Sequence, residues 1–163
     1  AKFMAIFVQN ILLAEDTPDD AFLMRLALQW AGIASALTEV GDGREALAYL
    51  SGKGAFGDRS RYPLPDVLFL DVKMPWMSGF DVLSRMASEA HGPLPPAVIL
   101  SSTGEQKDRE LARSLGAAFY AVKPPTPELF ATLAAQLGLE WARDGFPQPS
   151  QAPNGHTRLV QPR

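Results

Sequence analysis

Five side chains that suit phosphate chemistry stand at the ends of apolar segments or directly after them. Glu15 and Asp16 follow "NILLA", Asp71 follows "DVLFL", Ser101 ends "AVILS" and Lys123 follows "FYAV". A carboxylate can take a phosphoryl group as a nucleophile, and a lysine can donate hydrogen bonds to phosphoryl oxygens. We therefore interpret Asp71 as a candidate phospho-acceptor and Lys123 as the cation that offsets charge during transfer.

The three acids predict a bound cation if the fold brings them together. At a separation of about 4 Å, each ionised pair would repel by about 4 kcal/mol at an effective dielectric constant of about 20. That repulsion is large beside the roughly 5 to 15 kcal/mol that stabilises an ordinary fold, so either one acid keeps a proton or a cation lies between them. Oxygen ligands without nitrogen or sulfur neighbours favour Mg²⁺, with Mn²⁺ as the alternative.

Ser101 and Tyr120 are candidates for a conformational response. The hydroxyl group of Ser101 can turn toward a new phosphoryl oxygen, and Tyr120, three residues before Lys123, can then move inward to fill the space. Lys73 and Thr103 flank the predicted pocket, and a plain surface role is the simpler interpretation for both.

Five apolar segments must position these side chains. They are short and several are almost continuously apolar, as expected of strands covered on both faces: 10–14, 36–40, 66–70, 97–101 and 119–122. Segments with helical marks separate them, which predicts an α/β domain with a doubly wound, five-stranded parallel sheet and five helices. Ligands of such sheets bind beyond the carboxyl ends of the strands, where the candidate residues stand.

The first helix has a recognisable start. Thr17 can cap it, Pro18 suits the first helical position, and Asp19 and Asp20 favour the positive end of the helix dipole. Gly32 is expected to end this helix.

Length and composition predict one soluble domain. The chain has 163 residues, of which 47% are hydrophobic and 20% charged. We expect an N-terminal extension or the start of the first strand at 1–9, the domain at 10–142, and a flexible, proline-rich tail at 143–163. A long connection at 51–65 precedes the third strand.

Several functional classes are disfavoured. The net charge is −3 without long runs of either sign, which argues against a nucleic-acid partner. Cysteine is absent, so thiolate chemistry is excluded and a reducing cytoplasm is compatible. No apolar run reaches the roughly 20 residues that span a bilayer, so we expect no membrane association. Neither His91 nor His156 has the setting of a ligand or a base.

The motifs together resemble the receiver domains of bacterial response regulators, over about residues 10–141. The matching features are the acid pair at 15–16, "DVKMPWMSG" as the Asp-x-x-Met-Pro-x-x-x-Gly signature, the hydroxyl of Ser101, the aromatic ring of Tyr120, and "KP" at 123–124. The resemblance implies a flavodoxin-like (receiver) fold and a signalling protein of two-component systems rather than an enzyme that turns over other substrates.

The same resemblance implies specific roles. Asp71 would accept the phosphoryl group from a sensor histidine kinase, and Mg²⁺ would be held by Glu15, Asp16, Asp71 and the backbone carbonyl of Lys73. Ser101 and Tyr120 would form the switch. The output would pass to a downstream protein through the surface of the fourth helix, fifth strand and fifth helix, which could also form a homodimer.

Two departures from the family pattern narrow the resemblance. Position 101 is Ser where Thr is usual, which removes a methyl group that stiffens the rotamer. The long connection at 51–65 and the aromatic residue in "GLEWA" at 138–142 are similar to stand-alone response regulators that partner phytochrome-type kinases. A bacteriophytochrome is therefore the expected type of kinase.

Three other functions have less support in the sequence. Phosphohydrolases of the haloacid dehalogenase type place a second acid two residues after the nucleophile, where this chain has Lys73. A receiver-like module that is never phosphorylated lacks support, because all the required side chains are present. The segment after Trp141 is too short and irregular for a helix-turn-helix DNA-binding domain.

Overall fold

The computed structural model describes residues 5–89 and 92–144 and has a five-stranded parallel sheet at its centre. The strand order is β3-β2-β4-β5-β6, and all pairings are parallel. The bounds are Asn10–Ala14 for β2, Ala36–Val40 for β3, Val67–Asp71 for β4, Ala97–Ser101 for β5 and Phe119–Val122 for β6. The predicted doubly wound sheet is confirmed.

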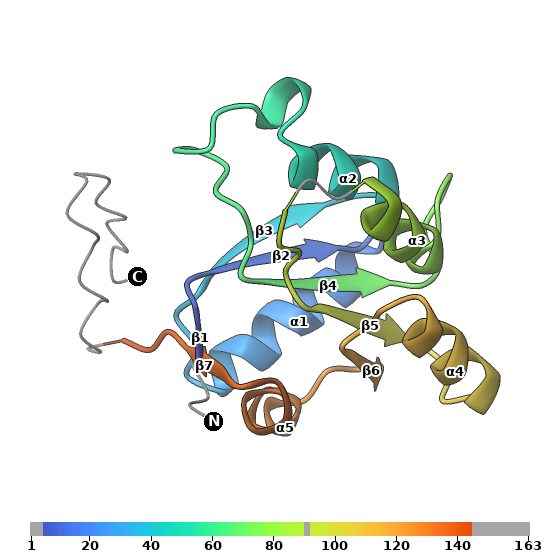
Figure 1. Cartoon of the computed structure of the whole chain (residues 1–163). Helices are drawn as coiled ribbons and strands as arrows, with labels where there is room; N and C mark the ends of the chain where they lie inside the picture. The colour runs from blue at the N-terminus through green and yellow to red at the C-terminus, as the bar shows by residue number, and fades with distance from the viewer. Residues whose placement is uncertain (1–4, 90–91, 145–163) are drawn as a thin grey trace.

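Five helices cover the two faces of this sheet (Figure 1). Their bounds are Pro18–Trp30 for α1, Gly43–Ser51 for α2, Gly79–Glu89 for α3, Gln106–Ser114 for α4 and Pro127–Leu137 for α5. Helices α1 and α5 pack with one face into one buried cluster, and α2, α3 and α4 pack with the other face into a second cluster. Every residue of β4 and β5 is buried, which explains why both segments are so apolar.

Local sequence explains where the helices begin and end. The side chain of Asp42 accepts a hydrogen bond from the backbone N–H of Glu45, whose own carboxylate accepts one from the N–H of Gly41. Thr17 stands at the N-cap of α1, but its side chain makes no capping hydrogen bond, contrary to the expectation. The backbone N–H of Thr17 instead donates to the carboxylate of Glu15, so this turn helps to position one of the three candidate acids.

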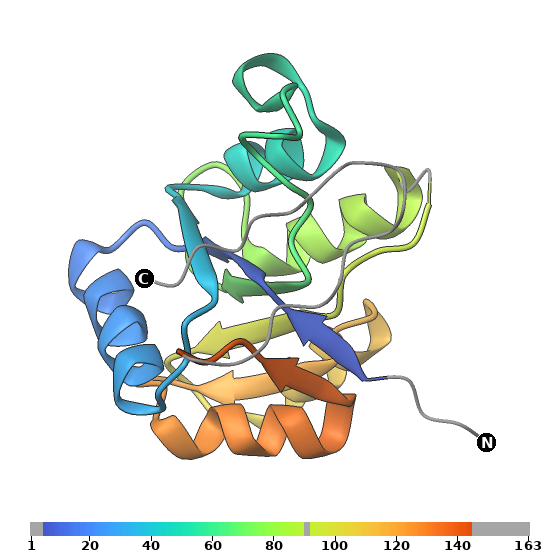
Figure 2. The same ribbon diagram turned by 90° about the vertical axis from the view of Figure 1, so that its left-hand side faces the viewer.

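A second, two-stranded parallel sheet was not anticipated. Strand β1 (Ile6–Val8) pairs with β7 (Leu139–Trp141), and the two lie side by side at the amino end of β2 (Figure 2). The indole N–H of Trp141 donates to the carbonyl of Phe130 at 2.8 Å, and the two rings meet edge to face. Residues 6–8 are therefore a strand of their own rather than the start of the first strand.

The connection at 51–65, which we name the insertion loop, is an ordered structure. It stands out from the body beyond α2 and includes a short 3₁₀ helix, Gly54–Phe56 (Figure 1). The guanidinium group of Arg59 donates to the carbonyls of Tyr49 at 2.7 Å and Leu50 at 2.8 Å. Arg59 thereby donates to carbonyls in the last turn of α2, one of which, that of Tyr49, also accepts from the N–H of Gly52 at 3.2 Å.

Some expectations fall largely outside the described residues. Of the predicted tail at 143–163, the structure describes only Arg143 and Asp144, and both His91 and His156 lie outside. None of the helices in the described part of the chain is both long and apolar enough to cross a bilayer.

Candidate functional site

The site lies where the strand order reverses. The chain passes from β2 to β3 on one side and then back to β4 on the other side of β2, and such a reversal is where doubly wound sheets bind ligands. The register pairs Ala14 with Leu70, so the next residues, Glu15 and Asp71, emerge together from neighbouring strands. Both are buried, with 7% and 5% of their surface exposed, whereas Asp16 is exposed.

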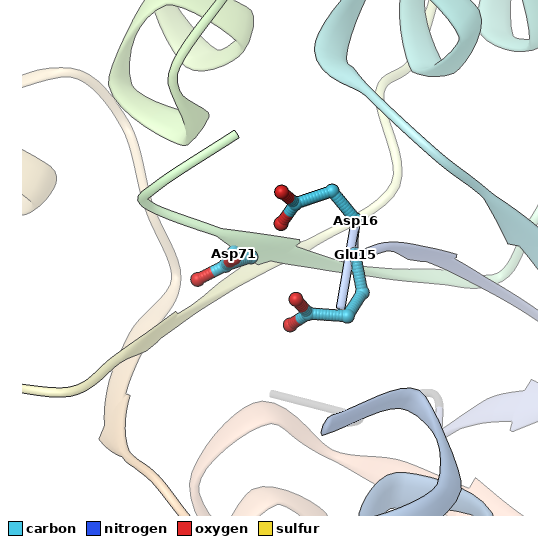
Figure 3. A group of neighbouring side chains, drawn as sticks. All are labelled: Glu15, Asp16 and Asp71. Carbon is cyan, nitrogen blue, oxygen red and sulfur yellow. The ribbon is translucent and has the colours of Figure 1, made fainter. Parts of the chain in front are cut away.

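The three predicted acids do meet. One carboxylate oxygen from each of Glu15, Asp16 and Asp71 lies within 4.8 Å of the others, and Figure 3 shows the groups gathered beyond the strand ends. All three donors are hard oxygen atoms at a spacing that a single divalent cation can bridge. The residues present therefore fit a divalent metal ion, as the sequence predicted.

Lys123 joins this cluster from β6. Its Nζ atom lies 2.8 Å from Oε2 of Glu15 and 3.0 Å from Oδ1 of Asp71. The backbone N–H of Lys123 donates to the carbonyl of Ser101 at 2.7 Å, which holds the residue at the end of the sheet. The predicted convergence of Asp71, Asp16 and Lys123 at one end of the sheet is confirmed, and their chemical roles stay predictions.

Asp20 is a site residue that the sequence analysis missed. Its Oδ2 atom lies 2.8 Å from Nζ of Lys123, although the two residues are 103 positions apart. Asp20 stands in the first turn of α1, and helical side chains tilt toward the helix N-terminus, so its carboxylate reaches back to the strand ends. In the sequence, Asp20 is an acid shortly after Glu15 and Asp16, and the preference for acids at the start of a helix is enough to explain it.

Burial and charge shift two pKa values in the site. Burial raises the pKa of Glu15 to about 7; hydrogen bonds from Lys123 and from the N–H of Thr17 partly oppose the rise, and the charge of Asp71 adds to it. Burial opposes the charged form of Lys123, but hydrogen bonds to Asp20, Glu15 and Asp71 outweigh it and raise the pKa of the amine above its ordinary value. Lys123 therefore stays an ammonium group at neutral pH.

The signature glycine has a steric cause. A Cβ atom on Gly79 would lie 2.5 Å from the carbonyl oxygen of Asp71. The backbone N–H of Gly79 donates to the carbonyl of Val72 at 3.1 Å. Only a residue without a side chain lets α3 begin this close to the backbone of Asp71. The start of α3 at Gly79 therefore packs directly against the backbone at the end of β4.

The loop between β4 and α3 carries an exposed aromatic ring. Trp76 has 76% of its surface exposed and a positive φ of 69°. The guanidinium carbon of Arg44 lies 4.6 Å from its ring centroid, at cation–π distance. The side chain of Lys73 in this loop is exposed, and the role of its carbonyl as a metal ligand stays a prediction.

The two predicted switch residues bond to opposite sides of one residue, Thr103. Its backbone N–H donates to Oγ of Ser101 at 3.2 Å, and its carbonyl accepts from the hydroxyl of Tyr120 at 2.6 Å. The ring of Tyr120 packs against the second core cluster, with Arg109 over it at 4.9 Å. The backbone of Thr103 thus links the two residues, whereas the role of its side chain and the inward movement of Tyr120 stay predictions.

The comparison with protein families now identifies the class. The family model of the response regulator receiver domain matches residues 11–134. The chain belongs to this family, as its fold and the convergence of Glu15, Asp16, Asp71 and Lys123 indicated.

Solved structures of phytochrome-associated regulators are among the most similar. The bacteriophytochrome response regulator AtBRR superimposes with a TM-score of 0.73 at 33% identity, over 85% of this chain and 99% of AtBRR. The phosphorylated cyanobacterial phytochrome response regulator RcpA superimposes with a TM-score of 0.66 at 27% identity, over 80% of this chain and 94% of RcpA.

Curated relatives differ in length. The chain is 30% identical over 135 residues to an uncharacterized 14.6 kDa protein of Leptolyngbya boryana and spans 94% of it. It spans only 23% of a probable cyclic di-GMP phosphodiesterase of Vibrio cholerae and 43% of a probable transcriptional regulatory protein of Mycobacterium tuberculosis. The activities of those longer proteins are therefore not carried over.

Proposed function

We propose that this chain accepts a phosphoryl group on Asp71 from a sensor histidine kinase and signals through altered contacts with another protein. One observation carries the proposal: the buried carboxylate of Asp71 lies 3.0 Å from the ammonium group of Lys123 and beside two further acids. This arrangement supports the proposal because a nucleophile, a fixed cation and a set of hard metal ligands would surround the same small volume.

The transfer exchanges one phosphoryl bond for another. A carboxylate oxygen of Asp71 attacks the phosphorus atom, the phosphorus–nitrogen bond of the donor phosphohistidine breaks, and the bonding pair leaves with the imidazole, which takes up a proton. Lys123 donates hydrogen bonds to the phosphoryl oxygens as their charge develops. The product is an acyl phosphate on Asp71.

A divalent metal ion, Mg²⁺ or Mn²⁺, would be held by Glu15, Asp16, Asp71 and the carbonyl of Lys73. When bound, it would offset the negative charge of the phosphoryl group during transfer. The acids supply the oxygen ligands that such ions prefer, and the burial of Glu15 and Asp71 keeps their orientation fixed.

The donor kinase that we propose is of the phytochrome type. The support is the similarity to AtBRR, named as a bacteriophytochrome response regulator, at 33% identity over 99% of its length. Such a kinase would place the protein in the cytoplasm. We propose no turnover of external phosphate esters, because the position two residues after Asp71 is Lys73 rather than an acid.

The output surface that we propose consists of α4, β6 and α5. Leu111 of α4 has 43% of its surface exposed and Val122 of β6 has 40%, so apolar side chains are available there for a second copy or a target protein. Sedimentation velocity with and without beryllofluoride, a phosphoryl mimic, would test the homodimer. A sedimentation coefficient that stays at the monomer value in both states would contradict it.

Incubation with Mg²⁺ and acetyl phosphate, followed by intact-mass measurement, tests the phospho-acceptor. We expect the protein to gain the mass of one phosphoryl group and the Asp71→Asn variant to gain none. Equal labelling of both would place the acceptor elsewhere, and no labelling of either would support an interaction module that is not phosphorylated. Transfer from a radiolabelled bacteriophytochrome kinase, compared with an unrelated histidine kinase, tests the pathway.

A further inference from the structure

Every N–H donor of the Lys123 ammonium group has a carboxylate within hydrogen-bond distance. The group carries three N–H donors, and three carboxylates lie within hydrogen-bond distance: Glu15 and Asp20 at 2.8 Å and Asp71 at 3.0 Å. A phosphoryl oxygen on Asp71 needs a donor from the same ammonium group. One of the existing contacts must therefore be given up when the phosphoryl group arrives.

Exposure indicates which contact is given up. The side chain of Glu15 is 2% exposed, so losing Lys123 would leave a buried carboxylate without its cation, and Asp71 carries the phosphoryl group itself. The side chain of Asp20 is 34% exposed, and water can replace the hydrogen bond that it loses. Asp20 is thus the partner whose release costs least.

The surroundings of the Asp20–Lys123 contact agree with this order. Both side chains line a cavity of about 300 Å³ together with Leu23 and Pro124. The cavity gives water access to the carboxylate of Asp20, and Glu15 also lines it. Asp20 also adds a negative charge near the place where an anionic phosphoryl group must come to rest, which opposes its approach.

We propose that Asp20 is a positioning residue that holds Lys123 away from the incoming phosphoryl group and so slows phosphorylation of Asp71. This inference rests on the proposed function. Glu15 and Asp71 are sufficient to keep the ammonium group in the site. Removing the charge of Asp20 leaves at most a weaker hydrogen bond to a neutral amide oxygen, so the donor is released more easily without losing the lysine.

The test compares Asp20→Asn with Asp19→Asn. Both variants remove one acid from the first turn of α1, but Asp19 is exposed and stands outside the Lys123 cluster, so helix-dipole effects are matched. Initial rates of labelling by acetyl phosphate at saturating Mg²⁺ are measured by intact mass, and folding is checked by thermal denaturation. We expect Asp20→Asn to react roughly two- to five-fold faster than the wild type and Asp19→Asn to react at the wild-type rate.

A conservative variant separates positioning from a structural role. Asp20→Glu keeps a carboxylate beside Lys123, and we expect it to restore a slow rate. An Asp20→Asn rate equal to or below that of Asp19→Asn, in a preparation whose wild type is labelled on Asp71, overturns this inference and leaves the proposed function intact. A wild type that takes no label overturns both.

Discussion

Lowering the pH from about 8 to about 6 is expected to weaken Mg²⁺ binding roughly ten-fold, because Glu15 must lose its proton to become a ligand. Burial holds the pKa of this carboxyl group at about 7. The ionised fraction of a group with that pKa falls about ten-fold between the two pH values, and the apparent affinity falls with it.

Isothermal titration calorimetry at both pH values, in buffers of different ionisation enthalpy, measures the affinity and the protons released. We expect about one proton to leave per metal ion at the lower pH. Glu15→Gln should bind Mg²⁺ more weakly at both pH values and lose the pH dependence. Asp16→Asn should also bind Mg²⁺ more weakly, but its affinity should keep the pH dependence because Glu15 is still present. An affinity that is the same at both pH values in the wild type would refute the reasoning.

The same pKa has a consequence for stability without metal. The folded state raises the pKa of Glu15 from 4.5 to about 7, so it binds the proton more tightly than the unfolded chain does. The corresponding stabilisation is complete below about pH 4.5 and is lost as the pH rises through about 7. Thermal melts in a chelator should show this loss, and Mg²⁺ should reduce it at the higher pH.

Three further substitutions test how the site and its supports are held. Gly79→Ala should lower the free energy of unfolding by about 1–3 kcal/mol or more, because its Cβ atom would meet backbone at the end of β4, whereas Gly41→Ala, which has open space, should not; urea denaturation compares the two. Arg59→Ala should cost about 1–3 kcal/mol by removing its hydrogen bonds to the last turn of α2, and Arg61→Ala less than about 0.5 kcal/mol; a wild-type melting curve for Arg59→Ala would contradict this role. Trp141→Phe should cost about 1–3 kcal/mol by removing a buried hydrogen bond to α5, seen as an earlier thermal transition.

The central sheet and most of the site follow from short-range patterns. The apolar segments 10–14, 36–40, 97–101 and 119–122 coincide with strands, and 66–70 is shifted by a single residue. Such segments are identifiable because burial on both faces demands continuous apolar side chains. Once the strands are placed, the rule that ligands bind at carboxyl ends brings Asp71 and Lys123 together.

Features that depend on contacts between distant segments were not predictable in this way. The role of Asp20 requires knowing that the first turn of α1 faces Lys123, and an acid at a helix start has an adequate local explanation. The pairing of β1 with β7 joins residues more than a hundred positions apart. The capping role of Arg59 depends on how the insertion loop folds back, for which the sequence has no periodic signal.

The pairing of β1 with β7 brings the two ends of the described chain together at the amino end of β2 (Figure 2). The three carboxylates lie at the other ends of the strands, where β2 and β4 finish. A fluorophore or surface tether attached at the exposed side chain of Glu140 in β7 would stand away from the carboxylates that a donor protein must reach. The molecule could therefore be immobilised through this strand for optical or force measurements of the proposed phosphotransfer.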